Sequence, residues 1–218
     1  MLAASLHRFA TCPSVPTDYA QTVDVVSTRV AQALINAMEA KSPYLRGHSH
    51  RVAAVAATVA AELGFPEQSI EQVRMAGHLH DVGKIGVRES VLDKPGSLTA
   101  EEFAHVKEHV TIGLNILAPL PLGPALDFIA HHHERIDGSG YPFGLSGDAV
   151  SLGGRILGAA DALDALTSPR AYRDAMTAEE ALVCLAAEGP RGICPTVLPA
   201  LARLVQGGQV LVFLNDGT

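Results

Sequence analysis

Apolar residues return every three or four positions along most of this chain, which is the spacing that lets a helix face a core. The first such face is formed by Val23, Val26, Val30, Leu34 and Met38, and the next by Val52, Val55, Val59 and Leu63. The alternation typical of strands is scarce, and tryptophan is absent. The sequence therefore predicts an all-α fold, a single helical-bundle domain of about eight helices.

Local start and stop signals divide this pattern. The first helix is expected to begin at Thr17 or Asp18 and to end at Ser42-Pro43, because the residue before a proline disfavours helical geometry. Two Thr-Ala-Glu-Glu segments, at Thr99 and Thr177, are typical of capping boxes. The expected helices cover about 18–40, 48–63, 66–80, 100–117, 122–134, 152–166 and 178–187, with a last one after Pro195. We expect a lead over 1–16, a single helical domain over 17–207, and a tail over 208–218, of which 210–218 forms a short strand or frays.

Composition limits the classes of function. Among the 218 residues, 48% are hydrophobic and 18% charged, which is ordinary for a globular protein. The net charge of −7 argues against a DNA or RNA duplex as partner, since that surface needs basic residues. No signal peptide or membrane span is expected, because prolines and Asp127 interrupt the apolar run over 110–130. The three cysteines form no CxxC pair and favour a reducing cytoplasm; they are Cys12, Cys184 and Cys194.

The most unusual stretch is His131-His132-His133-Glu134, which leads into the loop Asp137-Gly138-Ser139-Gly140-Tyr141-Pro142. Three adjacent histidines are too polar for a core, and neutral imidazole is the commonest metal ligand. The glycines and the proline can fix an irregular loop close to whatever the histidines hold. The stretch predicts a metal site with a substrate loop beside it.

A second pair, His80-Asp81, stands at the end of an expected helix and is followed by Lys84. Neighbouring helical residues project about 100° apart, so the histidine suits one ion while the carboxylate bridges to a second. A polar helix end, in which Asp81 caps the next turn, explains the pair equally well.

Four further residues are ambiguous when taken singly. His48 and His109 lie on helices otherwise made of core residues, where a lone histidine is more often a satisfied core residue than a ligand. Asp161 lies on an Ala/Leu-rich helix, so it either faces solvent or has a cation. Asp164 follows one turn later and is a candidate to orient a metal ligand.

Taken together, these positions offer five imidazoles and two carboxylates: His48, His80, His109, His132, His133, Asp81 and Asp161. Mixed nitrogen and oxygen ligation suits Fe(II), Mn(II) or Zn(II). Two such ions, roughly 3.5–4 Å apart, would generate a bridging hydroxide and hold a phosphate for in-line attack. Lys84, Arg170 and Arg173 are candidate phosphate anchors. Surface salt bridges are the alternative for the two arginines.

The order of these motifs resembles the HD-GYP family over about residues 20–205. The matching segments are His48-Ser-His-Arg51-Val52, His80-Asp81-Val-Gly83-Lys84, His109, His132-His133-Glu134, Asp137-Gly138-Ser-Gly140-Tyr141-Pro142, Asp161 with Asp164-Ala165, and Ser168-Pro-Arg170 with Tyr172-Arg173. One such motif alone would be a weak signal. Their occurrence in the family's order makes the resemblance specific.

The resemblance implies a bacterial metallo-phosphodiesterase that cleaves cyclic di-GMP to pGpG, and often onward to GMP, by attack of a hydroxide bridging two Fe(II) or Mn(II) ions. It implies that the seven residues above ligate the metals, that Asp81 bridges them, and that His80, Asp81 and Lys84 are catalytic. Lys84, Arg170 and Arg173 would hold the substrate phosphates. The Gly140-Tyr141-Pro142 loop would shape the guanine and phosphate pocket, and it would offer a contact surface for diguanylate cyclase (GGDEF) domains.

Two departures from the family pattern qualify this reading. Some members carry a glutamate four residues before the first histidine, and it recruits a third metal; this chain has Tyr44 there. We therefore expect two metals and slow hydrolysis of pGpG. Residues 1–16 are too short for a sensory domain, so we expect a free-standing enzyme or a separate regulatory protein.

Several alternatives stay open. The chain could be a nucleotide sensor or scaffold that binds GGDEF partners, or an HD phosphodiesterase for another cyclic dinucleotide such as cGAMP. The apolar face of the helix over 18–40 could pair with a second copy in a homodimer, or it could be internal packing.

Overall fold

The structure is a computed structural model that describes residues 17–41, 45, 47–169, 174–189 and 193–215. The helical elements are α1 (Thr17–Lys41), α2 (His48–Glu62), α3 (Glu67–Leu79), η2 (Val82–Gly86), α4 (Glu89–Leu92), α5 (Ala100–Lys107), α6 (His109–Leu117), α7 (Ala125–His131), η3 (Gly147–Ala149), α8 (Leu152–Thr167), α9 (Ala178–Ala187), α10 (Leu198–Gln206) and α11 (Leu211–Asn215). Within these ranges the only β-type pairing is an isolated bridge between Asp137 and Ser146. The all-α prediction is confirmed.

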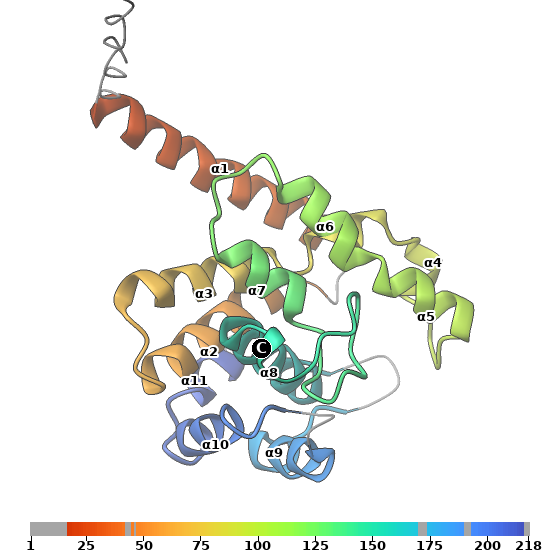
Figure 1. The fold of residues 1–218 in the computed structure, drawn as a ribbon. Coiled ribbons are helices and arrows are strands. Elements are labelled where there is room, and N and C mark those ends of the chain that lie inside the picture. The colour runs from red at the N-terminus through yellow and green to blue at the C-terminus, as the bar shows by residue number, and fades with distance from the viewer. Residues whose placement is uncertain (1–16, 42–44, 46, 170–173, 190–192, 216–218) are drawn as a thin grey trace, which may run out of the picture.

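Four helices, α2, α3, α7 and α8, form the centre of the molecule (Figure 1). α2 packs against α3 and α8, and α7 packs against the same two helices. Val52 and Val55 of α2 and Ile156 and Leu157 of α8 are wholly excluded from water. Around this centre, α6 packs on η2, while α9 and α10 lie below α8 in the view of Figure 1.

A single glycine sets how closely α2 and α3 approach each other. A Cβ at Gly77 would lie 2.4 Å from the Cα of Ala53, closer than real Cβ atoms come to a backbone. The two helices run antiparallel, so this contact near the end of α3 brings the residue after α3, His80, close to the start of α2. The site described below depends on that crossing.

The first helix is only partly a core element. Ala31, Ile35 and Met38 of α1 are buried, but Val30, which the sequence pattern placed on the buried face, is 40% exposed. That part of the prediction is wrong, because the side of α1 that packs inward is formed by Ala31, Ile35 and Met38, and Val30 lies beside it. Val23 and Val26 lie where side chains are not described. None of the described helices has the length and apolar character needed to cross a membrane.

Three other helix predictions need correction. The expected helix over 100–117 is divided at Glu108 into α5 and α6, and α6 packs closely on η2. The expected helix over 122–134 ends at His131, so the next two histidines lie beyond it. Residues 211–215, expected as a strand or a frayed end, form α11, which packs on α2 beside the buried Val210.

The capping box at Thr177 is confirmed and can be tested. The Thr177 hydroxyl accepts from the backbone N–H of Glu180 at 3.2 Å, and the Glu180 carboxylate accepts from the backbone N–H of Thr177 at 2.9 Å. We expect Thr177→Ala to lower the free energy of unfolding by about 1 kcal/mol, measured by urea denaturation. Thr111→Ala is the control, since the Thr111 hydroxyl only donates to a carbonyl of its own helix. An equal loss in both variants would contradict the capping role.

Candidate metal centre

Three of the expected histidine ligands hold their rings in the same way. In each ring, Nδ1 faces the backbone carbonyl oxygen three residues earlier, at 2.8 Å for His80, 2.7 Å for His109 and 2.6 Å for His132. A carbonyl can only accept, so Nδ1 carries the hydrogen and donates it. The lone pair of Nε2 is therefore left free in all three rings, which is the state that binds a metal.

Helix ends explain this common arrangement. His80 follows the last residue of α3, His132 follows the last residue of α7, and His109 begins α6 just after the end of α5. The last carbonyls of a helix have no partner within the helix, so an imidazole at that point can donate to one of them. The packing of α3, α6 and α7 then directs the three Nε2 atoms toward one another.

One group of donor atoms gathers around His48, the first residue of α2. Its Nε2 lies 3.3 Å from Nε2 of His80 and 3.4 Å from both Oδ2 of Asp81 and Oδ1 of Asp161. Lone pairs on two nitrogens and two carboxylate oxygens repel at such distances unless a positive charge lies among them. The group therefore fits a cation.

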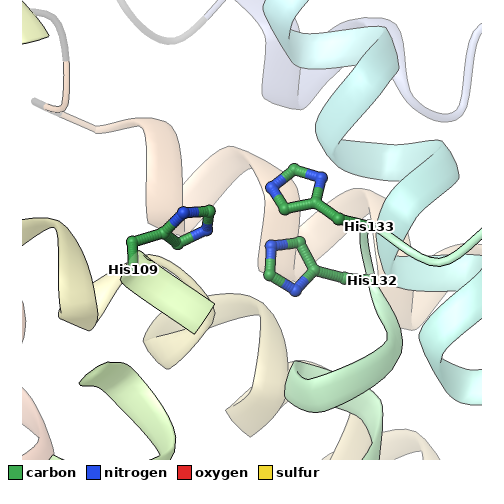
Figure 2. Close-up of side chains that lie close together, drawn as sticks. All are labelled: His109, His132 and His133. Carbon is green, nitrogen blue, oxygen red and sulfur yellow. The ribbon is translucent and has the colours of Figure 1, made fainter. Parts of the chain in front are cut away.

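A second group is formed by His109, His132 and His133, whose ligand nitrogens all lie within 4.8 Å of one another. Figure 2 shows His109 reaching from α6 toward the two adjacent rings that follow α7. Asp81 lies between the groups: its Oδ2 faces His80 at 3.4 Å, and its Oδ1 faces His109 at 3.5 Å. The interpretation of Asp81 as a helix cap is wrong, because its side chain makes no capping hydrogen bond.

The residues present fit a metal ion by a second criterion. Oδ1 of Asp81, Nε2 of His109 and Nε2 of His132 are fully buried and have no hydrogen-bond partner. Burying an unsatisfied polar atom costs about 1–3 kcal/mol. Three such atoms pointing into one small space are explained by a divalent ion that all of them contact.

Electrostatics distinguish the two groups. Burial, reinforced by His80 and His109, lowers the pKa of His132 to about 3, and burial with His132 lowers the pKa of His133 well below its usual value. Burial also acts to lower the pKa of His48, but hydrogen bonds to carboxylates outweigh it and raise that pKa to about 9. The second group thus holds neutral imidazoles ready to bind a metal, and the first favours a positive charge, whether a proton or a metal ion.

His48 is held differently from the other three rings. It begins its helix and so has no helical carbonyl behind it; its Nδ1 lies 2.7 Å from Oδ2 of Asp164 instead. Arg51, one turn later in α2, donates to both oxygens of Asp164 at 2.6 and 3.1 Å. Asp164 therefore orients a candidate ligand, as its position in the sequence suggested.

The glycine-rich loop lies directly beside the second group. The Tyr141 ring stacks on His133 with centroids 4.7 Å apart, and the Tyr141 N–H donates to the His133 carbonyl at 3.2 Å. Glu134 is 4% exposed and accepts from the backbone N–H groups of Phe143 at 2.6 Å and Leu145 at 3.0 Å. A Cβ at Gly140 would lie 2.4 Å from the Cα of Glu134, so the loop passes too close to the chain for a larger residue.

Residues 32–195 match the HD domain family. The chain belongs to this family. The match covers most of the chain and includes both groups of ligand atoms and the loop. It agrees with the resemblance drawn from the order of the sequence motifs.

Two curated relatives are similar to the HD domain of this chain. The 3'3'-cGAMP-specific phosphodiesterase 3 of Vibrio cholerae serotype O1 is 40% identical over 167 residues, which make up 76% of this chain and 36% of that protein. The cyclic di-GMP phosphodiesterase response regulator RpfG of Xanthomonas campestris pv. campestris is 40% identical over 181 residues, 81% of this chain and 46% of that protein. The chain thus spans less than half the length of either relative.

A solved structure supports the fold. Bd1817, a HDG"Y"P protein from Bdellovibrio bacteriovorus, superimposes with a TM-score of 0.62 over 87% of this chain and 64% of that chain. The two sequences are 21% identical, so this likeness shows the shared helical fold of the HD domain and nothing finer.

The structure brings together most of the predicted site residues. All seven candidate metal ligands of the HD domain lie in the two groups or between them, and Lys84 lies against Asp81, with its Nζ 2.5 Å from Oδ2. Tyr44, Arg170 and Arg173 lie outside the described residues. Pro142 follows Tyr141 through a cis peptide bond.

Sequence reasoning missed two residues that hold this site. The sequence motifs contain Arg51 and Glu134 but assign them no role. In the structure, Arg51 donates to Asp164, and Glu134 accepts from the backbone of the glycine-rich loop. A signal existed for each. Arg51 lies one helical turn from His48, and Glu134 follows the histidines directly, where a buried carboxylate needs several donors.

Proposed function

We propose that this HD domain hydrolyses cyclic di-GMP as a metal-dependent phosphodiesterase, with pGpG as product. The observation that carries the proposal is the pair of ligand groups joined by Asp81, whose buried atoms point into one space. The names of the relatives support the substrate class, because one is a cyclic di-GMP phosphodiesterase and the other acts on 3'3'-cGAMP. Both substrates are cyclic dinucleotides of purines.

We assign two ions to the site, Fe(II) or Mn(II), which mixed imidazole and carboxylate ligation suits. His48, His80 and Asp161 would hold one ion, and His109, His132 and His133 the other, with Asp81 shared. When bound, the ions would supply Lewis acidity that polarises a phosphodiester and acidifies water. Three metal ions per chain, found by elemental analysis after anaerobic purification, would contradict this count.

The chain's own residues have separate tasks in this proposal. Asp81 fixes the spacing between the two ligand groups. Lys84 would offset negative charge that develops on the phosphate, because its partly exposed ammonium lies beside Asp81 at the site. Tyr141, stacked on His133, forms a wall that limits the entry of water. Arg170 and Arg173 stay predicted phosphate anchors.

The test is turnover of cyclic di-GMP, 3'3'-cGAMP and cyclic di-AMP by anaerobically purified protein loaded with Fe(II) or Mn(II). We expect pGpG from cyclic di-GMP and slower release of GMP. A clear preference for 3'3'-cGAMP would mean that this chain acts on the substrate in the name of the Vibrio cholerae relative and not mainly on cyclic di-GMP. Binding without turnover by the metal-loaded protein would favour the sensor or scaffold alternative. A GGDEF partner stays a prediction of the resemblance. A homodimer, a separate regulator and a bacterial cytoplasmic location also stay predictions from the sequence.

The contact between Asp164 and His48 gives a further prediction. We expect Asp164→Asn to lower the metal affinity of the His48 group by about 10–100-fold, because the neutral amide weakens both the hold on the imidazole and the pairing with Arg51. Competition with a metal chelator measures this affinity.

Asp127→Asn is the matched control, since Asp127 is an exposed carboxylate of α7. Equal metal affinities in the Asp164 variant and the control would show that Asp164 does not orient the ligand.

A further inference from the structure

Beyond the candidate metal ligands, a row of three side chains in contact, Tyr141, Phe103 and Lys107, extends from His133. Tyr141 stacks on the His133 ring, and Phe103 meets the Tyr141 ring edge-on with centroids 6.2 Å apart. Nζ of Lys107 lies 4.7 Å from the centroid of Phe103 and 5.2 Å from that of Tyr141. Phe103 and Lys107 are four residues apart in α5, so they share one face of that helix.

Packing does not account for these two residues. Phe103 is 45% exposed, so much of its ring remains open to a ligand. Of the lysines in the described part of the chain, Lys41, Lys84 and Lys94 donate to carbonyl or carboxylate oxygens. Among the described residues, the contacts of the Lys107 ammonium are with the Phe103 and Tyr141 rings. In a protein with a net charge of −7, an ammonium without a carboxylate partner beside an anion-handling site is a candidate ligand contact.

We propose that Phe103 and Lys107 form a subsite for the half of the cyclic dinucleotide that is not being cleaved. Phe103 stacks one purine base on its open face, and Lys107 contacts the second phosphodiester. This inference rests on the proposed function. Its geometric basis is the row of contacts from His133 through Tyr141 to Phe103 and Lys107: with one phosphodiester at the metal centre, a second nucleotide that extends past Tyr141 meets α5.

The location of α5 strengthens the inference. Lys107 is the last residue of α5, and His109 begins α6 only two residues later. The subsite and a candidate ligand therefore belong to one continuous segment of chain. Base stacking on an exposed aromatic ring and a charge-assisted contact to a phosphate tolerate either purine, so this subsite selects cyclic dinucleotides over smaller phosphodiesters without choosing between guanine and adenine.

The test compares Phe103→Ala and Lys107→Met with the wild type on cyclic di-GMP and on bis(p-nitrophenyl) phosphate, which has neither a purine nor a second phosphate. Losing one stacked base or one charged hydrogen bond weakens binding by about tenfold or more. We therefore expect each variant to raise KM for cyclic di-GMP about tenfold, with kcat changed less than about twofold. Hydrolysis of the small diester and the metal content should stay unchanged. Lys94→Met is the control, since Lys94 is paired with Glu102.

Three results would overturn the subsite. Wild-type turnover with an unchanged KM in both variants would remove the subsite and leave the proposed function intact. Equal losses of activity on cyclic di-GMP and on bis(p-nitrophenyl) phosphate would mean that Phe103 and Lys107 support the metal centre instead. No turnover of any cyclic dinucleotide by metal-loaded wild type would contradict the proposed function, and the subsite would fall with it.

Discussion

Asp81→Ala is expected to lower the rate of phosphodiester hydrolysis by at least about 10³-fold. The Asp81 carboxylate faces both ligand groups, with Oδ2 toward His80 and Oδ1 toward His109. Without it, the two ligand groups would lose the carboxylate that they share. Single-turnover kinetics with cyclic di-GMP, alongside the metal content of the variant, measures the effect.

Two observations keep this prediction specific. Asp148→Ala makes the same chemical change at a fully exposed carboxylate, and we expect wild-type rates from it. The histidine-only group at 109, 132 and 133 should still retain a metal ion, so the metal content of Asp81→Ala is expected to fall without vanishing. A variant that keeps both the full metal content and the rate would remove Asp81 from the centre of the site.

Gly83→Ala is expected to destabilise the fold by about 3 kcal/mol or more and to displace His109 from the second ligand group. A Cβ at Gly83 would lie 1.8 Å from the carbonyl oxygen of His109 and 2.5 Å from the backbone nitrogen of Gly113. Backbone atoms cannot move aside as a flexible side chain does, so α6 must shift away from η2. Thermal unfolding and the metal content of the variant measure the two effects.

Gly113→Ala is the matched control from the other side of the same interface. Its Cβ would lie 3.3 Å from the nearest atom, the backbone nitrogen of Gly83, which needs a shift of only a few tenths of an ångström. Alanine also favours a helix over glycine by about 1 kcal/mol, so the net change should be small. Similar losses of stability in both variants would mean that the close approach of η2 and α6 is not the cause.

Much of the helical pattern could be predicted because it depends on neighbouring residues. The capping boxes at Thr99 and Thr177 lie where the sequence placed them, and α2 and α8 follow the expected bounds within about two residues. The break at Glu108 could not be predicted this way, because Phe103, Val106 and Val110 continue the helical spacing across it. The break lies next to the close contact between η2 and α6, which joins separate parts of the chain.

The sequence by itself determined the helical class, the family and the identity of the candidate ligands, because helix signals are local and the motifs occur in a recognisable order. Only the tertiary structure decided how these ligands divide into two groups. The distances depend on where helix ends meet, and these depend on backbone contacts at Gly77 and Gly83. The tertiary structure also decided that Glu134 holds the loop that follows it, that Arg51 supports the site through Asp164, and that Phe103 faces outward beside Tyr141. For Arg51 and Phe103 the partner lies far away in sequence.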